Sequence, residues 1–146
     1  MTDKEKIRIS KTELFKLRGV CSQLEKLYDT RDGLIMSLYG TGIDYSKDRI
    51  QTSPVNMMEE AFAITSEIDQ KIDELIETRN RYVQRIYNMK RDMSVNLLID
   101  IYRNRRSYRS IAYELGVSES TVYERQERAL IEYFNTNYSV GIATEH

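Results

Sequence analysis

Residues 108–130, YRSIAYELGVSESTVYERQERAL, have the spacing of two short helices that meet at a sharp corner. Ile111, Ala112 and Leu115 recur at helical spacing, so we expect them on the inner side of the first helix. Gly116 is expected to end that helix, because glycine tolerates the left-handed backbone common at helix C-termini. The pattern predicts a helix-turn-helix, which presents its second helix to DNA. The alternative is an ordinary helical hairpin within a bundle.

The residues after this glycine are predicted to form the turn and the second helix. Val117 can anchor the turn in the core, and the Ser118 hydroxyl can cap the next helix. The inward face is predicted to continue at Val122, Ala129, Leu130 and Tyr133. Glu127 is expected to face outward, and the positions expected to face DNA bases are Ser118, Glu119, Ser120, Thr121, Tyr123 and Glu124.

Basic residues gather in the middle of the chain, although the formal net charge is −1. Between Arg79 and Arg109, nine Lys and Arg residues are opposed by Asp92 and Asp100. The cluster from Arg105 to Arg109, which carries no acid of its own, directly precedes the helix that crosses the DNA backbone in a helix-turn-helix. Phosphate contact is therefore favoured over a solvated turn. The predicted phosphate-contacting residues are Arg103, Arg105, Arg106, Tyr108, Arg109, Arg125 and Arg128.

Several other classes of protein are disfavoured. Cys21 stands alone, which excludes an intramolecular disulfide and a cysteine-based zinc site. The start, MTDKEKIRIS, lacks the apolar core of a signal peptide, and no later apolar run could span a bilayer, so we expect a cytoplasmic protein without a membrane partner. His146 is the single histidine, and no glycine-rich phosphate loop occurs, so we expect neither an enzyme nor a cofactor or metal site.

Two heptad seams precede the helix-turn-helix. The first comprises Leu14, Leu17, Cys21, Leu24, Tyr28, Arg31, Ile35 and Leu38. The second comprises Ala61, Ile64, Ile68, Ile72, Leu75, Arg79, Tyr82, Ile86 and Met89. Consecutive four-residue steps at Ile64, Ile68 and Ile72 should locally relax the supercoil. The seam arginines are expected to reach solvent, and Ser53 and Pro54 are placed as the cap and first residue of the second helix.

Together these patterns predict an all-α chain with a single proline. We expect a coiled-coil helical hairpin over residues 1–92 with a loop at about 39–56, a DNA-binding domain over 93–135, and a flexible tail over 136–146. The seams could pair within one chain as an antiparallel hairpin or between chains, and we expect some self-association. A further helix from about Met93 to Asn104 should support the helix-turn-helix through Val95, Leu98, Ile99 and Tyr102.

Residues 93–134 resemble region four of the sigma factors, through Ser118, Thr121, Val122, Arg125, Arg128, Ala129 and Leu130. Apart from its two ends, the chain also resembles the ArpU/RinA-type transcriptional regulators of bacteriophages of Gram-positive bacteria, through DRIQTS at 48–53 and IDQKIDELIE at 68–77. This resemblance implies a phage-encoded regulator of late genes, for packaging, morphogenesis or lysis, that binds upstream DNA and activates the host RNA polymerase.

The predicted second helix departs from the sigma pattern, because Glu119, Thr121 and Tyr123 stand where basic residues are usual. A carboxylate there could accept a hydrogen bond from a cytosine amino group, but it repels phosphates, so arginines must supply the attraction. The alternative function is an interaction module that binds RNA polymerase or another regulator without reading DNA. Salt separates the two, since arginine–phosphate binding weakens steeply as salt rises.

Overall fold

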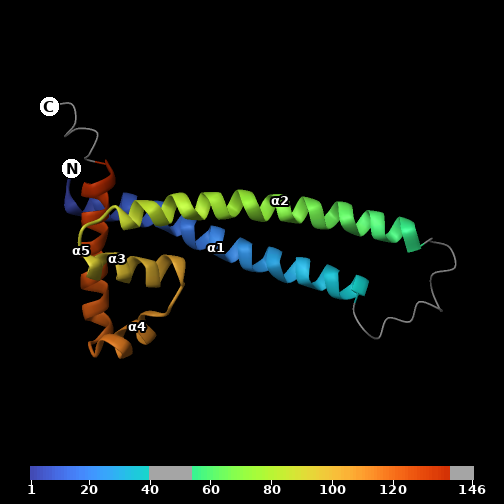
Figure 1. Ribbon diagram of the computed structural model, residues 1–146. Coiled ribbons are helices and arrows are strands. Elements are labelled where there is room, and N and C mark those ends of the chain that lie inside the picture. The colour runs from blue at the N-terminus through green and yellow to red at the C-terminus, as the bar shows by residue number, and fades with distance from the viewer. Residues whose placement is uncertain (40–53, 139–146) are drawn as a thin grey trace. The chain divides into compact units, whose positions relative to one another are not determined.

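The computed structural model describes residues 1–39 and 54–138, and these residues form helices and short connections without a strand (Figure 1). The α-helices are α1 (Asp3–Tyr39), α2 (Pro54–Tyr87), α3 (Asp92–Leu98), α4 (Tyr108–Leu115) and α5 (Glu119–Tyr138). The π-helix η1 (Ile99–Arg103) continues α3. The predicted all-α fold class is confirmed. Among the described helices, none has the length and apolar character needed to cross a membrane.

The chain divides into two compact units, and the division passes through both long helices. Unit 1 comprises Met1–Cys21 and Thr78–His146, and unit 2 comprises Ser22–Glu77. Unit 1 thus combines the predicted DNA-binding segment with the start of α1 and the end of α2. The α5 helix continues through Tyr138, past the predicted start of the tail at residue 136. Residues 139–146 and residues 40–53 of the loop predicted at about 39–56, including the predicted cap Ser53, lie outside the described residues, and α2 already begins at Pro54.

Unit 2 contains the later part of the first predicted seam and the earlier part of the second. Leu24, Ala61 and Ile72 are buried, and Ile35, Ile68 and Leu75 are half-buried. The prediction for Ile64 is wrong, because 46% of this residue is exposed. Each four-residue step turns the side chain by about 40° on a helix of 3.6 residues per turn, so Ile64 lies well away from the face of Ile72.

Two polar seam positions in unit 2 remain in contact with solvent. Tyr28 is 37% exposed and so is less buried than the apolar seam positions beside it. Arg31 reaches solvent, as predicted, and also binds Asp69 at 2.8 Å, with both side chains more than a third exposed. The pair joins α1 to α2 within this unit.

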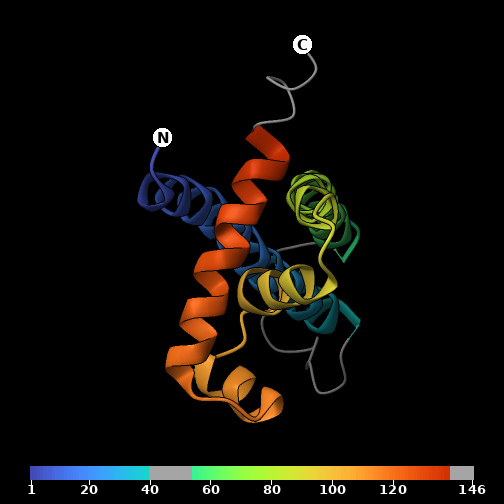
Figure 2. The ribbon, with the colours of Figure 1, turned by 90° about the vertical axis from the view of Figure 1, so that its left-hand side faces the viewer.

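Unit 1 is built on one apolar core that draws on every helix. The seam residues Leu14, Leu17 and Ile86 are fully buried there, as predicted. They join buried residues from η1, α4 and α5, among them Ile101, Tyr102, Ile111, Val122, Leu130 and Tyr133. In Figures 1 and 2, α3 and α4 lie beside the long α5 helix.

The supporting helix differs from its prediction in its last turn. It begins at Asp92 and changes into η1 at Ile99, and the Asn104 amide donates to the Ile99 carbonyl at 2.9 Å. Val95, Leu98 and Tyr102 are buried as predicted, and Ile99 packs against the core. The π-helical turn accommodates one extra residue per turn, which helical periodicity alone does not reveal.

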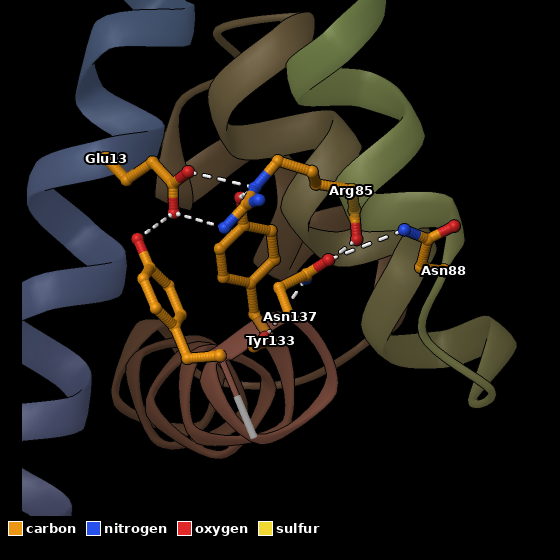
Figure 3. A network of polar contacts seen from close by, with 6 residues as sticks. Glu13, Arg85, Asn88, Tyr133 and Asn137 are labelled. Atoms are coloured by element: carbon orange, nitrogen blue, oxygen red, sulfur yellow. Dashed lines mark hydrogen bonds and ion pairs between the residues drawn. The ribbon is translucent and has the colours of Figure 1, made fainter. Parts of the chain in front are cut away.

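A polar network links α1, α2 and α5 within unit 1 (Figure 3). The Arg85 guanidinium lies 2.9 Å from the Glu13 carboxylate and donates to the Tyr133 hydroxyl at 3.1 Å. The Tyr138 hydroxyl donates to the same carboxylate at 2.7 Å. The Asn137 amide donates to the Arg85 carbonyl at 2.9 Å. Glu13 therefore accepts hydrogen bonds from two other helices at once.

Burial sets the chemistry of this network. It raises the pKa of the Tyr133 hydroxyl, against the opposing effect of its hydrogen bond from Arg85. The ring stays neutral at physiological pH, so the charge of Arg85 is balanced by Glu13. The Glu13 side chain is only 16% exposed, so the loss of its charge would leave Arg85 poorly compensated.

Replacement of two glycines should change stability in opposite directions. At Gly116, φ is +68° and no atom lies within 4 Å of an added Cβ, so Gly116→Ala should lower the free energy of unfolding through backbone strain alone, by about 1 to 2 kcal/mol. Gly19→Ala, inside α1 and equally uncrowded, should raise it by about 1 kcal/mol through helix propensity. Urea denaturation at one protein concentration measures both. Equal effects would contradict the left-handed turn.

Two isosteric substitutions test the polar network. Glu13→Gln should lower the free energy of unfolding by about 1 to 3 kcal/mol, because it removes the charge that balances Arg85. Asp69→Asn, which breaks the more exposed Arg31 pair, should cost less than about 1 kcal/mol. Chemical denaturation of the two variants side by side gives the comparison. Losses of the same size would show that the network contributes no more than a surface ion pair.

Candidate nucleic-acid interface

The corner between α4 and α5 is fixed by caps at three points. Ser107 begins α4 by accepting a hydrogen bond from the Ser110 amide at 3.1 Å. Gly116 ends α4 in the left-handed conformation, as predicted. Ser118 accepts from the Thr121 amide at 3.2 Å, so its predicted capping role is confirmed. Val117 packs against the core between the two helices.

The outward row of α5 consists of Ser120, Tyr123, Glu124 and Glu127, all of which are exposed. Their spacing places them on one side of the helix, and Glu119 is exposed at its start. Val122, Ala129, Leu130 and Tyr133 are buried on the other side, as predicted. The face that could meet a DNA groove is therefore polar and acidic.

Thr121 lies apart from this outward row. It is half-buried, and its hydroxyl is 3.0 Å from the Ser118 hydroxyl. The two predicted base-facing side chains thus hydrogen-bond each other in the turn. Their first role in this structure is to hold the start of α5.

Two tyrosines stack across the corner. The ring centroids of Tyr108 and Tyr123 are 4.3 Å apart, with an angle of 23° between the planes. Tyr108 begins α4 and was predicted to contact phosphate, whereas Tyr123 was predicted to contact a base. A residue predicted to contact phosphate therefore lies directly against a residue predicted to contact a base. Stacking also limits how far either ring can turn.

The arginine cluster carries no acid in its own sequence, but in the structure two acidic side chains lie close to Arg106. Its guanidinium binds Asp100 at 3.3 Å and Glu114 at 2.5 Å, and it donates to the Ser110 hydroxyl at 3.0 Å. The turn after η1 brings these acids close, because the Arg106 amide donates to the Asp100 carbonyl at 2.9 Å. Arg106 therefore holds this turn in place.

The other predicted phosphate contacts occupy different environments. Arg103 and Arg105 are half-buried, and Arg105 has a positive φ of 54° within the turn. Arg109 is exposed on α4. Arg109 thus has the most accessible guanidinium of the predicted turn cluster.

Arg125 and Arg128 lie on the flank of α5 that faces α3. They line a surface hollow of about 400 Å³ together with Thr121 and Arg91. The lining carries these three arginines and one acidic residue, Asp100, so its net positive charge favours an anion. The apolar part of its lining includes Met93, Leu97 and Leu115.

The prediction that Leu115 faces the core is wrong, because 45% of this residue is exposed. It is the last residue of α4, where the chain turns at Gly116, and its side chain faces the hollow instead. Ile111 and Ala112, one turn earlier, are buried as predicted.

Three residues around this site were not among the predicted site residues. Arg91, just before α3, lines the hollow, and the basic interval that contains it was a usable signal. Tyr113 on α4 is 91% exposed, and no pattern marks it. Gln126 is buried and donates to the Tyr102 hydroxyl at 2.8 Å, and its spacing from Val122 and Ala129 already placed it on the inward face. Burial raises the pKa of Tyr102 to about 12.

The arrangement separates negative from positive charge across the two helices. Carboxylates stand on the outward row of α5, where they can accept hydrogen bonds from exocyclic amino groups. Guanidinium groups stand on the flanks, at Arg109 on α4 and around the hollow, where they can bind phosphates. This chemistry suits a ligand that carries both amino edges and phosphates.

Comparisons with known proteins gave one family. Searches of curated proteins and of solved structures found no match. The model of a family described as a protein of unknown function, DUF1492, matches residues 42–135. That range runs from before α2 to within α5 and covers more than half of the 146 residues. The chain belongs to the DUF1492 family.

Proposed function

We propose that the protein is a transcription regulator that binds double-stranded DNA in a sequence-specific manner. The observation that carries this proposal is the capped corner of α4 and α5, which exposes Ser120, Tyr123 and Glu124 between flanking arginines. A helix so presented fits the major groove, whose width admits one α-helix. The helix before it, α4, then lies across the backbone.

In this proposal the outward row reads bases and the flanks bind phosphates. Glu119 or Glu124 accepts a hydrogen bond from a cytosine amino group, and Tyr123 contacts a thymine methyl group or a phosphate. Arg109 and Arg128, both exposed, supply attraction to the backbone. The carboxylates that give sequence specificity in this proposal therefore also lower the affinity for DNA of any sequence, because they repel phosphates.

The biological setting follows from resemblance to the ArpU/RinA-type regulators. On that basis the protein acts in a bacterial host cytoplasm as a phage-encoded activator of late genes, together with the host RNA polymerase. It needs no cofactor, metal or catalytic group for this role.

Self-association belongs to the same proposal and concerns unit 2. Large apolar side chains remain exposed on its two helices: Met36 is 69%, Met58 47% and Phe62 67% exposed. A second copy that covered such side chains would remove apolar surface from water. Two DNA-binding units in one assembly would also offset the weak binding expected of one acidic helix.

A second candidate function is an interaction module for RNA polymerase or another regulator, without direct DNA reading. The hollow beside α5 favours it, because exposed Met93 and Leu115 stand there next to Arg91. Such a surface suits an acidic, partly apolar protein segment.

The salt dependence of binding tests the phosphate contacts. Arg109→Ala with Arg128→Ala should weaken binding to every duplex and reduce the slope of log K against log salt by roughly 2, at about 0.9 per phosphate contact. Lys26→Ala with Lys71→Ala, exposed cations of unit 2, is the charge-matched control and should leave the slope unchanged. Gel-shift titrations over a salt series measure this. If both variants keep the wild-type slope of log K against log salt, Arg109 and Arg128 do not contact DNA phosphates.

Substitutions at Glu124 separate base reading from repulsion. Glu124 is exposed, so Glu124→Ala should leave the melting temperature nearly unchanged and alter the preference at one base pair by roughly 1 to 3 kcal/mol. Glu124→Gln keeps an acceptor and removes the charge, and should retain part of that preference. Competition binding against single-base variants of a selected site provides the measurement. If both variants bind all sequences more tightly and equally, Glu124 repels phosphates and reads no base.

A further inference from the structure

A basic stripe runs along the first turns of α1. Lys4, Arg8 and Lys11 are exposed, and their spacing places them on one side of the helix. Leu14 and Leu17, which are fully buried, lie on a different side. Among the described residues, none forms an ion pair with the side chains of these three cations. Their positive charge is therefore available to a ligand.

The stripe borders the outward row of α5. Lys4, Arg8 and Lys11 line a single surface hollow together with Glu5 and with Glu127, the last residue of that row, so three cations face two carboxylates there. The Lys6 ammonium group donates to the Asn135 side chain at 2.9 Å, which holds the start of α1 against α5. Figure 2 shows the beginning of α1 crossing α5.

The dimensions of the stripe match a nucleic-acid backbone. Lys4 and Lys11 are seven residues apart, which corresponds to about 10 Å along a helix. Successive phosphates of one strand rise by roughly 3.4 Å along the axis of duplex DNA, so a stripe of this length can reach neighbouring phosphates of one strand. The stripe also supplies cations on the side of α5 where Glu124 and Glu127 supply negative charge.

We propose that Lys4, Arg8 and Lys11 form a second phosphate-binding site, which contacts the DNA backbone beside the bases that α5 faces. This inference rests on the proposed DNA-binding function and adds a new element to it. The start of α1 then acts with the α4–α5 corner, so that the DNA backbone is bound both by the arginines beside α5 and at the Glu127 end of the acidic row. The attraction of the stripe offsets the repulsion between that row and the phosphates.

The test uses the full-length chain and duplex DNA of random sequence at a series of salt concentrations. Lys4→Ala/Arg8→Ala/Lys11→Ala should weaken binding and reduce the slope of log K against log salt by about 2 to 3. Lys26→Ala/Lys71→Ala/Arg81→Ala changes the net charge equally at exposed positions elsewhere and should keep the wild-type slope. Circular dichroism should give the same melting temperature for both, because every substituted side chain is exposed.

Each other outcome overturns the inference in a distinct way. If the wild-type protein binds duplex DNA and the stripe variant keeps the wild-type slope of log K against log salt, the stripe does not contact phosphates. The proposed function is then unaffected. An equal reduction of the salt slope in both variants would show that the net charge of the protein, and not the position of the stripe, determines the slope. A loss of self-association in light scattering, with an unchanged slope, assigns the stripe to a second copy of this chain. If the wild-type protein binds no duplex at any salt concentration, the proposed function fails together with the stripe.

Discussion

The apolar core to which every helix contributes is what unit 1 depends on, and beside it lies the hydrogen-bonded ion pair between Glu13 and Arg85. It joins α1 to α2, and the hydroxyls of Tyr133 and Tyr138 extend it to α5. The buried side chains of Leu14 and Leu17 turn one side of α1 toward the core, and the ion pair adds a polar contact between segments that are far apart in the chain. The position of the basic stripe beside the acidic row follows from that orientation.

The start of α1 and the end of α2 therefore belong to unit 1, although they were predicted as parts of a separate coiled coil. The first 21 residues of the chain belong to the same compact unit as α3, α4 and α5. A helix-turn-helix alone would carry its carboxylates outward with cations on one flank. With the start of α1 in place, cations also border the far end of the acidic row. In the proposed function the carboxylates contact bases, and the cations beside α5 and at the far end of the acidic row bind phosphates. This arrangement requires the whole of unit 1.

Local features were predictable from the sequence because local physics decides them. Gly116, the Ser118 cap and the buried face at Val122 follow from backbone preference, capping and helical period. Arg106 and Leu115 were not predictable, since their partners depend on the π-helical turn and on how a short helix ends. Lys4 and Glu127 share a hollow although they are more than 120 residues apart, and no periodicity in either helix signals that proximity.

The proposal that this protein selects DNA by sequence is tested by selection from a random pool. The purified protein is mixed with random-sequence duplexes at moderate salt, and the retained fragments are sequenced and footprinted. We expect enrichment of a common site, with protection centred on it. Retained DNA with the composition of the input pool, or no retention at any salt concentration, would contradict it and favour the protein-interaction alternative.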